Sequence, residues 1–183
     1  MGTGKELGSV LLTGGSSTLG RAIAASVAPF SSNIATTSRA PVDSLGTTIK
    51  ADFRNPDGFT ELYHWFAGGR TVNTLINNAG IYLRRPLADM TWQDWQELFS
   101  VNLFATAEVI RLAVSAGCTN VVNITDAGWH RAWPNHSAYL AAKAAVVALT
   151  RTLASELAPT VRGNAVAPGI VTIPESAPAS PTS

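Results

Sequence analysis

The chain has 183 residues, enough for one ordinary domain with a substantial core and too few for two. A formal net charge of +1 argues against a nucleic-acid-binding or membrane-surface protein. The single cysteine, Cys118, excludes an internal disulfide and gives no indication of a thiolate zinc site. Residues 1–8 lack the apolar segment of a signal peptide, and no apolar run reaches the roughly 20 residues of a membrane span. We therefore expect a cytoplasmic protein.

Short apolar runs alternate along the chain with longer segments of helical period, a pattern typical of repeated βαβ units. We expect an α/β, doubly wound (Rossmann) domain whose six parallel strands follow the order 3-2-1-4-5-6. Helices are predicted at 19–29, 57–67, 91–116 and 137–158, and Thr91 and Asp94 are placed to cap the third of these. The predicted strands are residues 10–12, 33–35, 48–50, 74–76, 121–124 and 164–166.

The last eleven residues, 173–183, change character abruptly. Three prolines with small polar neighbours cannot pack a core, so this tail is expected to be disordered. The domain prediction is a folded unit over 1–172 and a Pro/Ser-rich tail over 173–183.

A loop of small residues, 13–20, follows the first strand and leads into an alanine-rich helix. Free backbone N–H groups and the positive end of a helix bind a pyrophosphate, and glycines let the backbone approach it. Thr18 stands where a third glycine is often found, and its side chain either bonds a phosphate or narrows the approach. The predicted dinucleotide contacts in this loop are Gly14, Ser16, Ser17, Thr18, Leu19 and Gly20.

The segment after the second strand separates NAD sites from NADP sites, because an acid binds the ribose hydroxyls and a base binds the 2′-phosphate. Here Arg39 follows Ser38, with no acidic residue before Asp43. The sequence therefore favours NADPH over NADH. Asp52, after the third strand, either accepts a hydrogen bond from the adenine amine or simply ends that strand.

A second group of residues suits proton transfer. Tyr139 follows Asp126 by thirteen residues, and Lys143 follows Tyr139 by four, which places the phenol and the ammonium on one helix face. A neighbouring ammonium lowers the pKa of a tyrosine, so Tyr139 is predicted to donate a proton near neutral pH.

With these motifs in order, residues 8–172 resemble the short-chain dehydrogenase/reductase family. The resemblance implies that Tyr139 is the acid, that Lys143 also holds the nicotinamide ribose, and that Asn102 anchors a water in the proton relay. It further implies cofactor contacts from the segments 77–80 and 168–172. The contacts in these segments are Asn78, Ala79, Gly80, Pro168, Gly169 and Val171, and Phe53 is a further predicted cofactor contact.

Asp126 departs from most of the family, which has a serine there that bonds the substrate carbonyl. An ionised carboxylate would repel an oxyanion and would suit a substrate with N–H donors or a ring nitrogen that takes a proton. The substitution resembles the pteridine reductase branch, which reduces pterins or dihydrofolate with NADPH. The stretch 51–53, Arg39 and Tyr82 agree with that branch, where an aromatic residue at Tyr82 stacks on the pterin. The arginine usual at Thr18 is missing.

The aromatic loop 128–136 contains Trp129 and Trp133, which either wall the substrate pocket or cover the core or a subunit contact. His130 and His136 lack further ligands, so no metal site is expected.

The family normally continues beyond the turn at Pro168 with a substrate-covering segment and a seventh strand, and we expect both to be missing. The expected reaction is hydride transfer from NADPH to a C=N or C=O carbon of a small molecule, with a pterin-like or dihydrofolate-like compound as the first candidate. We expect a homodimer or homotetramer whose subunits pair through the helices 91–116 and 137–158. The alternatives are a catalytically impaired, cofactor-binding interaction protein, a carbonyl or quinone reductase, and a non-redox cyclase or isomerase.

Overall fold

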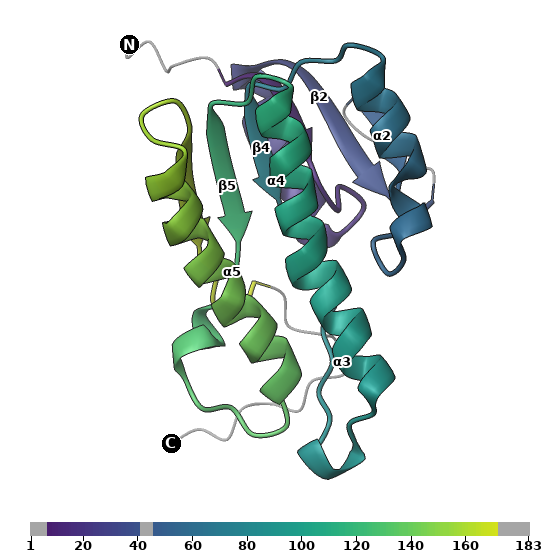
Figure 1. Cartoon of the computed structure of the whole chain (residues 1–183), viewed down its shortest axis with the longest axis vertical. Coiled ribbons are helices and arrows are strands. Elements are labelled where there is room, and N and C mark those ends of the chain that lie inside the picture. Colours follow the sequence, from purple (N-terminus) through teal and green to yellow (C-terminus); the bar gives the residue numbers. More distant parts are fainter. Residues whose placement is uncertain (1–6, 41–45, 172–183) are drawn as a thin grey trace.

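The structure, a computed structural model, describes residues 7–40 and 46–171. Six strands form one parallel sheet in the order β3-β2-β1-β4-β5-β6, which confirms the predicted topology (Figure 1). Two predictions lie outside the described residues: the tail 173–183 and the last residue of the predicted contact segment, Thr172. The strands are β1 (Gly8–Leu12), β2 (Ser31–Ser38), β3 (Thr47–Lys50), β4 (Thr74–Asn77), β5 (Asn120–Ile124) and β6 (Arg162–Val166).

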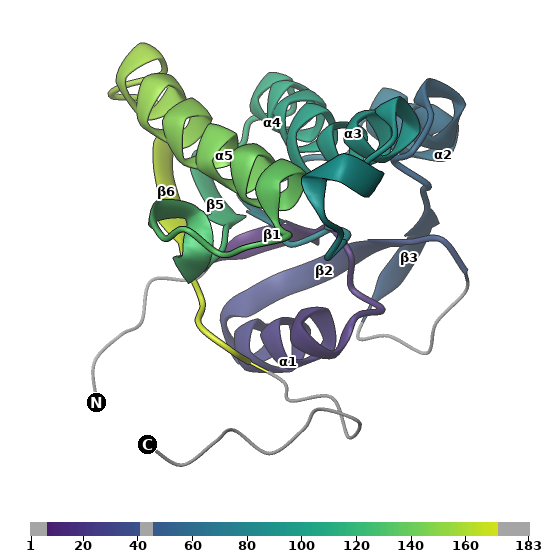
Figure 2. The same ribbon diagram turned by 90° about the horizontal axis from the view of Figure 1, so that it is seen from below.

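Helices cover both faces of the sheet. Figure 2 shows α1 alone on one face and α2, α3, α4 and α5 on the other, which makes three layers. The helices are α1 (Thr18–Val27), α2 (Thr60–Ala67), α3 (Trp92–Phe99), α4 (Ala105–Ser115) and α5 (Ser137–Glu156). Short 3₁₀ turns are η1 (Ala28–Phe30), η2 (Pro56–Phe59), η3 (Leu87–Asp89) and η5 (Ala127–His130).

The alternation of side chains along β1 supplies both cores. Leu11 packs with Leu75 and Val109 on the face covered by α2 to α5, whereas Val10 and Leu12 pack against the α1 face with Ala24. The central strands β1 and β4 are buried on both sides and contain consecutive apolar residues. This is why the strands could be located by short apolar runs.

The predicted single helix 91–116 is divided. Thr91 and Asp94 form the expected capping box at its start, but a π-helical turn, η4 (Ser100–Phe104), separates α3 from α4. Such turns insert one extra residue and occur often at functional sites. The segment Trp92–Ser115 is long and apolar enough to cross a membrane, but it packs Leu98 and Val109 into the interior as a core helix does.

The last strand, β6, is one of the two edge strands of the sheet in the described part of the chain. β6 pairs with β5 on one side only, and most of its residues are exposed. The segment that follows it carries Ile170 and Val171, which are 84% and 56% exposed. No seventh strand lies within the described residues.

Candidate active site

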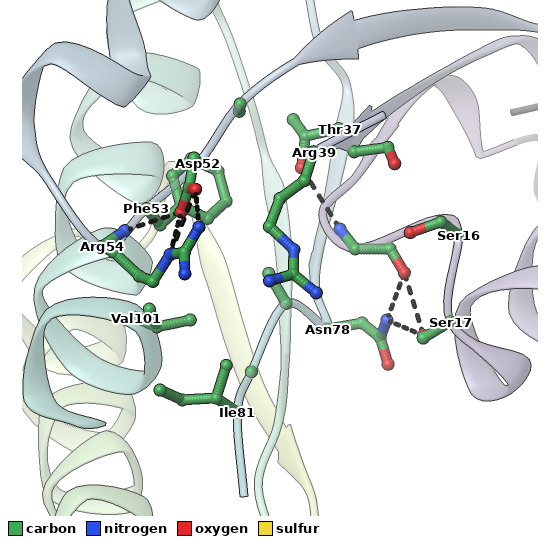
Figure 3. Close-up of a pocket in the computed structure, with 15 residues that line it drawn as sticks. Ser16, Ser17, Thr37, Arg39, Asp52, Phe53, Arg54, Asn78, Ile81 and Val101 are labelled. Carbon is green, nitrogen blue, oxygen red and sulfur yellow. Dashed lines mark hydrogen bonds and ion pairs between the residues drawn. The ribbon is translucent and has the colours of Figure 1, made fainter. Parts of the chain in front are cut away.

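A cavity of about 360 Å³ lies beyond the carboxyl ends of β1 to β4, where doubly wound folds bind their ligands (Figure 3). It brings together ten residues that the sequence analysis assigned to the cofactor, and five that it did not. The first group is Gly14, Ser16, Ser17, Ser38, Arg39, Asp52, Phe53, Asn78, Ala79 and Gly80. The second is Thr37, Ala51, Arg54, Ile81 and Val101.

The loop 13–20 fits a pyrophosphate. Gly14 has a φ of 69°, and a Cβ there would lie 2.8 Å from the Cα of Ala79. A Cβ on Gly20 would lie 2.2 Å from the carbonyl oxygen of Gly14, so α1 can start this close to the loop only at glycine. Ser17 caps α1 by accepting from the N–H of Gly20 at 3.0 Å. The N–H groups of Thr18 and Leu19 have no acceptor among the described residues and remain open to an anion.

Hydrogen bonds tie this loop to the segment after β4. The hydroxyl of Thr13 accepts from the N–H groups of Asn78 and Ala79 at 3.0 and 2.9 Å. The side-chain amide of Asn78 donates to the carbonyl of Gly14 at 3.1 Å, and the N–H of Gly14 donates to the hydroxyl of Thr37 at 3.2 Å. The floor of the cavity is therefore fixed before any ligand binds.

Two arginines line the far end of the cavity. Arg39 extends into it between Arg54 and Asn78 (Figure 3). Arg54 forms an ion pair with Asp52 and holds the pKa of that carboxyl below its usual range, with a smaller contribution from Arg39. Sequence reasoning missed Arg54, although its place two residues after Asp52 at a strand end was the available signal.

A second cavity, of about 200 Å³, shares Asn78, Gly80 and Ile81 with the first. The proton-transfer residues meet here with the predicted end of the nicotinamide site. Its lining includes Leu19, Tyr82, Asn102, Asp126, Tyr139, Lys143, Pro168, Gly169 and Val171, together with Ile124 and Thr125, which the sequence analysis did not assign.

Tyr139 lies in the first turn of α5 and is 8% exposed. Its hydroxyl donates to Oδ2 of Asp126 at 2.7 Å, and Oδ1 of Asp126 accepts from the N–H of Gly128 at 2.6 Å. Burial and this hydrogen bond raise the pKa of Tyr139 well above its ordinary value. The expectation of a lowered pKa was wrong for the structure as it stands, because the carboxylate, and not the ammonium, contacts the phenol.

Lys143 points toward the same cavity one turn later and is 6% exposed. Its ammonium donates to the carbonyl of Ile124 at 3.1 Å and lies 6.0 Å from the centre of the Tyr139 ring. Burial lowers the pKa of Lys143 to about 8, and the negative charge of Asp126 opposes the shift. The amine therefore loses its proton at a pH closer to neutral than an ordinary lysine does.

Asn102 lies in the π-helical turn and is 1% exposed. Its side-chain amide donates to the carbonyl of Ile81 at 3.0 Å and accepts from the N–H of Ile81 at 3.2 Å. A Cβ at Gly80 would lie 2.8 Å from Oδ1 of Asn102 and 3.5 Å from the Lys143 amine. Asn102 therefore fixes the segment that joins the two cavities.

Four predicted residues line neither cavity. Thr18 and Gly20 lie in the first turn of α1 and line neither cavity. Gly20 lets the helix start close to the loop, and Thr18 contributes a backbone N–H group that has no acceptor among the described residues. Trp129 and Trp133 are both more than a third exposed and are not among the residues that line the second cavity. Instead, the Trp133 ring packs over Gly128, where a Cβ would lie 2.7 Å from it.

Sequence and structure comparisons agree with this geometry. The family model for short chain dehydrogenases matches residues 9–182. The D-beta-hydroxybutyrate dehydrogenase of Rhizobium meliloti is 30% identical over 90% of this chain and 71% of its own length. The 3-oxoacyl-[acyl-carrier-protein] reductase of a Synechocystis species is 37% identical over 55% of this chain and 42% of that protein.

Solved structures give the same result. The ligand-free aldohexose dehydrogenase of Thermoplasma acidophilum superposes with a TM-score of 0.80 at 31% identity, over 91% of this chain and 69% of that one. A Beutenbergia cavernae protein described as an NAD(P)-dependent gluconate 5-dehydrogenase, with bound NADP, gives a TM-score of 0.80 at 32% identity, over 88% and 71%. None of these four relatives is a pteridine reductase, so they do not support the branch-level resemblance. The chain belongs to the short-chain dehydrogenase/reductase family of oxidoreductases.

Proposed function

We propose that the protein is an NADPH-dependent reductase that delivers hydride to a C=N or C=O carbon of a small molecule. The observation that carries this proposal is the junction of the two cavities. The loop-lined cavity and the cavity of Tyr139 and Lys143 share Gly80, so a cofactor that fills the first presents its far end to the phenol.

The residues of the chain divide the work. Bound NADPH supplies the hydride. The N–H groups of Thr18 and Leu19 bind the pyrophosphate, and Asn78 and Gly80 support the nicotinamide end. Tyr139 gives its hydroxyl proton to the substrate atom that gains electrons, and Lys143 stabilises the phenolate that remains. Asn102 holds the backbone between the two cavities.

The preference for NADPH rests on charge. Arg39 and Arg54 both line the cavity near the end of β2, and Asp52 neutralises only one of them. A 2′-phosphate would be bound by the remaining guanidinium, whereas a free ribose finds no unpaired carboxylate among the described residues that line this cavity. We propose that Asp52 contacts the adenine only with the part of its carboxylate that the ion pair with Arg54 leaves free.

Asp126 favours a nitrogen-containing substrate. Its carboxylate faces the cavity at hydrogen-bond distance from Tyr139, where it would repel an oxyanion but bind an N–H donor or a cationic C=N group. We therefore keep a pterin-like heterocycle as one proposed substrate. Tyr82 lines the same cavity and is the residue proposed to contact it. A carbonyl substrate is the second candidate, since the Synechocystis relative is a 3-oxoacyl reductase.

We also propose that the protein assembles with copies of itself and acts in the cytoplasm. Trp92 and Phe104, on the α3 and η4 segment, are 77% and 59% exposed, and aromatic side chains of this kind are common at subunit interfaces. The oligomer is checked by light scattering of the purified chain.

The test measures NADPH binding by fluorescence and NADPH oxidation in the presence of dihydrobiopterin or ethyl acetoacetate. We expect wild type to bind NADPH and to oxidise it with one of these acceptors. Tyr139→Phe is expected to bind NADPH equally and to lose at least about a hundredfold in turnover. Binding without turnover in wild type, unchanged by Tyr139→Phe, would instead support the cofactor-binding interaction protein.

A further inference from the structure

A hydrogen-bonded pair of side chains, Tyr82 and His136, lies beside the catalytic cavity. Tyr82 lines that cavity, and its ring meets the ring of Tyr139 edge-on, with 5.0 Å between centroids and an interplanar angle of 75°. Its hydroxyl lies 2.5 Å from Nε2 of His136, which is 54 residues further along the chain. We call this pair of residues the clasp.

The direction of the hydrogen bond follows from the other ring nitrogen. Nδ1 of His136 lies 2.7 Å from the carbonyl oxygen of Pro134, which can only accept. Nδ1 therefore carries the proton of the neutral ring, and Nε2 is the acceptor for the Tyr82 hydroxyl. Tyr82 donates to His136.

His136 is a firm anchor for Tyr82. It immediately precedes α5, and its carbonyl accepts from the N–H of Leu140 at 2.9 Å, so its position is set by the helix that carries Tyr139. The ring of Trp133 packs edge-on against it at 5.8 Å. A second tie runs beside the clasp, since the N–H of Arg85 donates to the carbonyl of Asn135 at 2.8 Å.

Without the clasp, little would hold Tyr82 in place. Its side chain is 61% exposed, and its recorded partners in the described part of the chain are His136 and the edge of Tyr139. A tyrosine this exposed ordinarily samples several rotamers. One charge-free hydrogen bond to a fixed acceptor selects the rotamer that stands beside the catalytic phenol.

We propose that the clasp determines substrate specificity: Tyr82 is the wall that limits the group attached to the reacting carbon, and His136 is the positioning residue that holds this wall. The inference rests on the proposed reductase function, because it concerns the substrate side of that site. It assigns a steric preference for a carbonyl or imine carbon with a small substituent on the side facing Tyr82.

The experiment uses two β-ketoesters that differ only beside the ketone, ethyl acetoacetate with a methyl group and ethyl benzoylacetate with a phenyl group. Binding of each to the full chain with NADP⁺ is measured by saturation-transfer NMR, and turnover with NADPH is measured separately. We expect wild type to prefer the methyl ester and Tyr82→Ala to shift the binding ratio toward the phenyl ester by about tenfold or more.

The role of His136 is tested with variants that break the hydrogen bond between Tyr82 and His136. Tyr82→Phe and His136→Ala should each shift the ratio in the same direction by about threefold to tenfold, and the double variant no further than either. His136→Gln, which keeps an acceptor near the position of Nε2, should restore most of the wild-type ratio. The matched control is Tyr63→Phe, which removes a hydroxyl bonded to Glu108 at 3.0 Å on another face of the molecule.

An unchanged binding ratio in Tyr82→Phe and His136→Ala overturns the proposal, as do additive shifts in the double variant. Failure of both esters to bind any variant also overturns it, since Tyr82→Ala should admit them. If the ratio shifts as expected but no variant or wild type oxidises NADPH, the clasp stands and the proposed reductase function fails.

Discussion

The hydroxyl of Tyr139 donates to Oδ2 of Asp126 at 2.7 Å. The phenol proton that we propose is transferred to the substrate is therefore hydrogen-bonded to a carboxylate. A serine at this position would share its own hydroxyl proton with the substrate, but Asp126 in its ionised form can only accept. The pair therefore favours an acceptor substrate that brings its own N–H or positive charge. Burial, and after it this hydrogen bond, raises the pKa of Tyr139 above its ordinary value.

Replacing Asp126 separates the two substrate classes. In Asp126→Ser we expect kcat/KM for ethyl acetoacetate to rise and kcat/KM for dihydrobiopterin to fall, because the serine donates to an oxyanion and no longer attracts a nitrogen. The pKa of Tyr139 should move down in the same variant, since the negative charge beside it is gone. Asp126→Asn is the control of similar shape without charge. Equal changes for both substrates would contradict a role in substrate choice.

Arg39 sets the cofactor preference in our proposal. Arg39→Ala should raise the KM for NADPH by about tenfold to a hundredfold, the range expected for a lost charge-assisted hydrogen bond, and leave the KM for NADH nearly unchanged. The measurement is a titration of each cofactor at fixed substrate. Arg70→Ala removes another exposed arginine, one that lines neither cavity, and should change neither constant. A parallel loss for NADH and NADPH would show that Arg39 does not read the 2′-phosphate.

Lys143 predicts the pH dependence of reduction. Its pKa is lowered to about 8 by burial, so the ammonium that stabilises the phenolate is lost as the pH rises through that value. We expect kcat/KM for reduction to be level below about pH 8 and to decline above it. Lys143→Arg stays protonated and should give a lower but level profile over the same pH range. A wild-type profile that stays level to pH 10 would exclude Lys143 as the titrating group.

The same amine affects stability. The folded pKa of Lys143 lies below the ordinary value of 10.5, so between about pH 8 and 10.5 the unfolded chain binds a proton that the folded chain has released. Stability from this group therefore rises with pH across that window, and the cost of the buried charge is greatest below it.

Lys143→Met is accordingly expected to raise Tm at pH 7, at about 2–4 °C for each kcal/mol, although it abolishes reduction. The advantage of the variant should shrink as the pH approaches 10. Thermal unfolding of both proteins at pH 7 and pH 10 provides the measurement. A gap in Tm that is the same at both pH values would mean that the ammonium carries no burial cost.

The fold and much of the site could be predicted because local signals determine them. The central strands β1 and β4 contain short apolar runs buried on two faces, and the loop 13–20 needs glycine where a Cβ would strike backbone. The break at Ser100 could not be foreseen, because η4 has the same apolar composition as a regular helix. The position of Trp133 and the ion pair of Arg54 also depend on side-chain packing rather than on spacing.

The direction of the pKa shift of Tyr139 could not be predicted from the sequence for a related reason. A spacing of four places Tyr139 and Lys143 on one helix face, but it does not show whether the amine or the carboxylate of Asp126, two residues after β5, contacts the phenol. The carbonyl of Ile124 binds the amine, and Asp126 takes the phenol. Contacts such as Tyr82 with His136, far apart in the chain, leave no periodic signal.

The π-helical turn makes the phase of the long helix depend on a single residue. Each residue of an α-helix advances the direction of its side chain by about 100°. Rewinding Ser100–Phe104 as regular α-helix with all its residues kept would rotate α4 relative to α3 through about that angle. Val109 and Ile110 would then leave the interior, and the amide of Asn102 would lose Ile81. The burial of Val109 and Ile110 therefore depends on this turn staying π-helical.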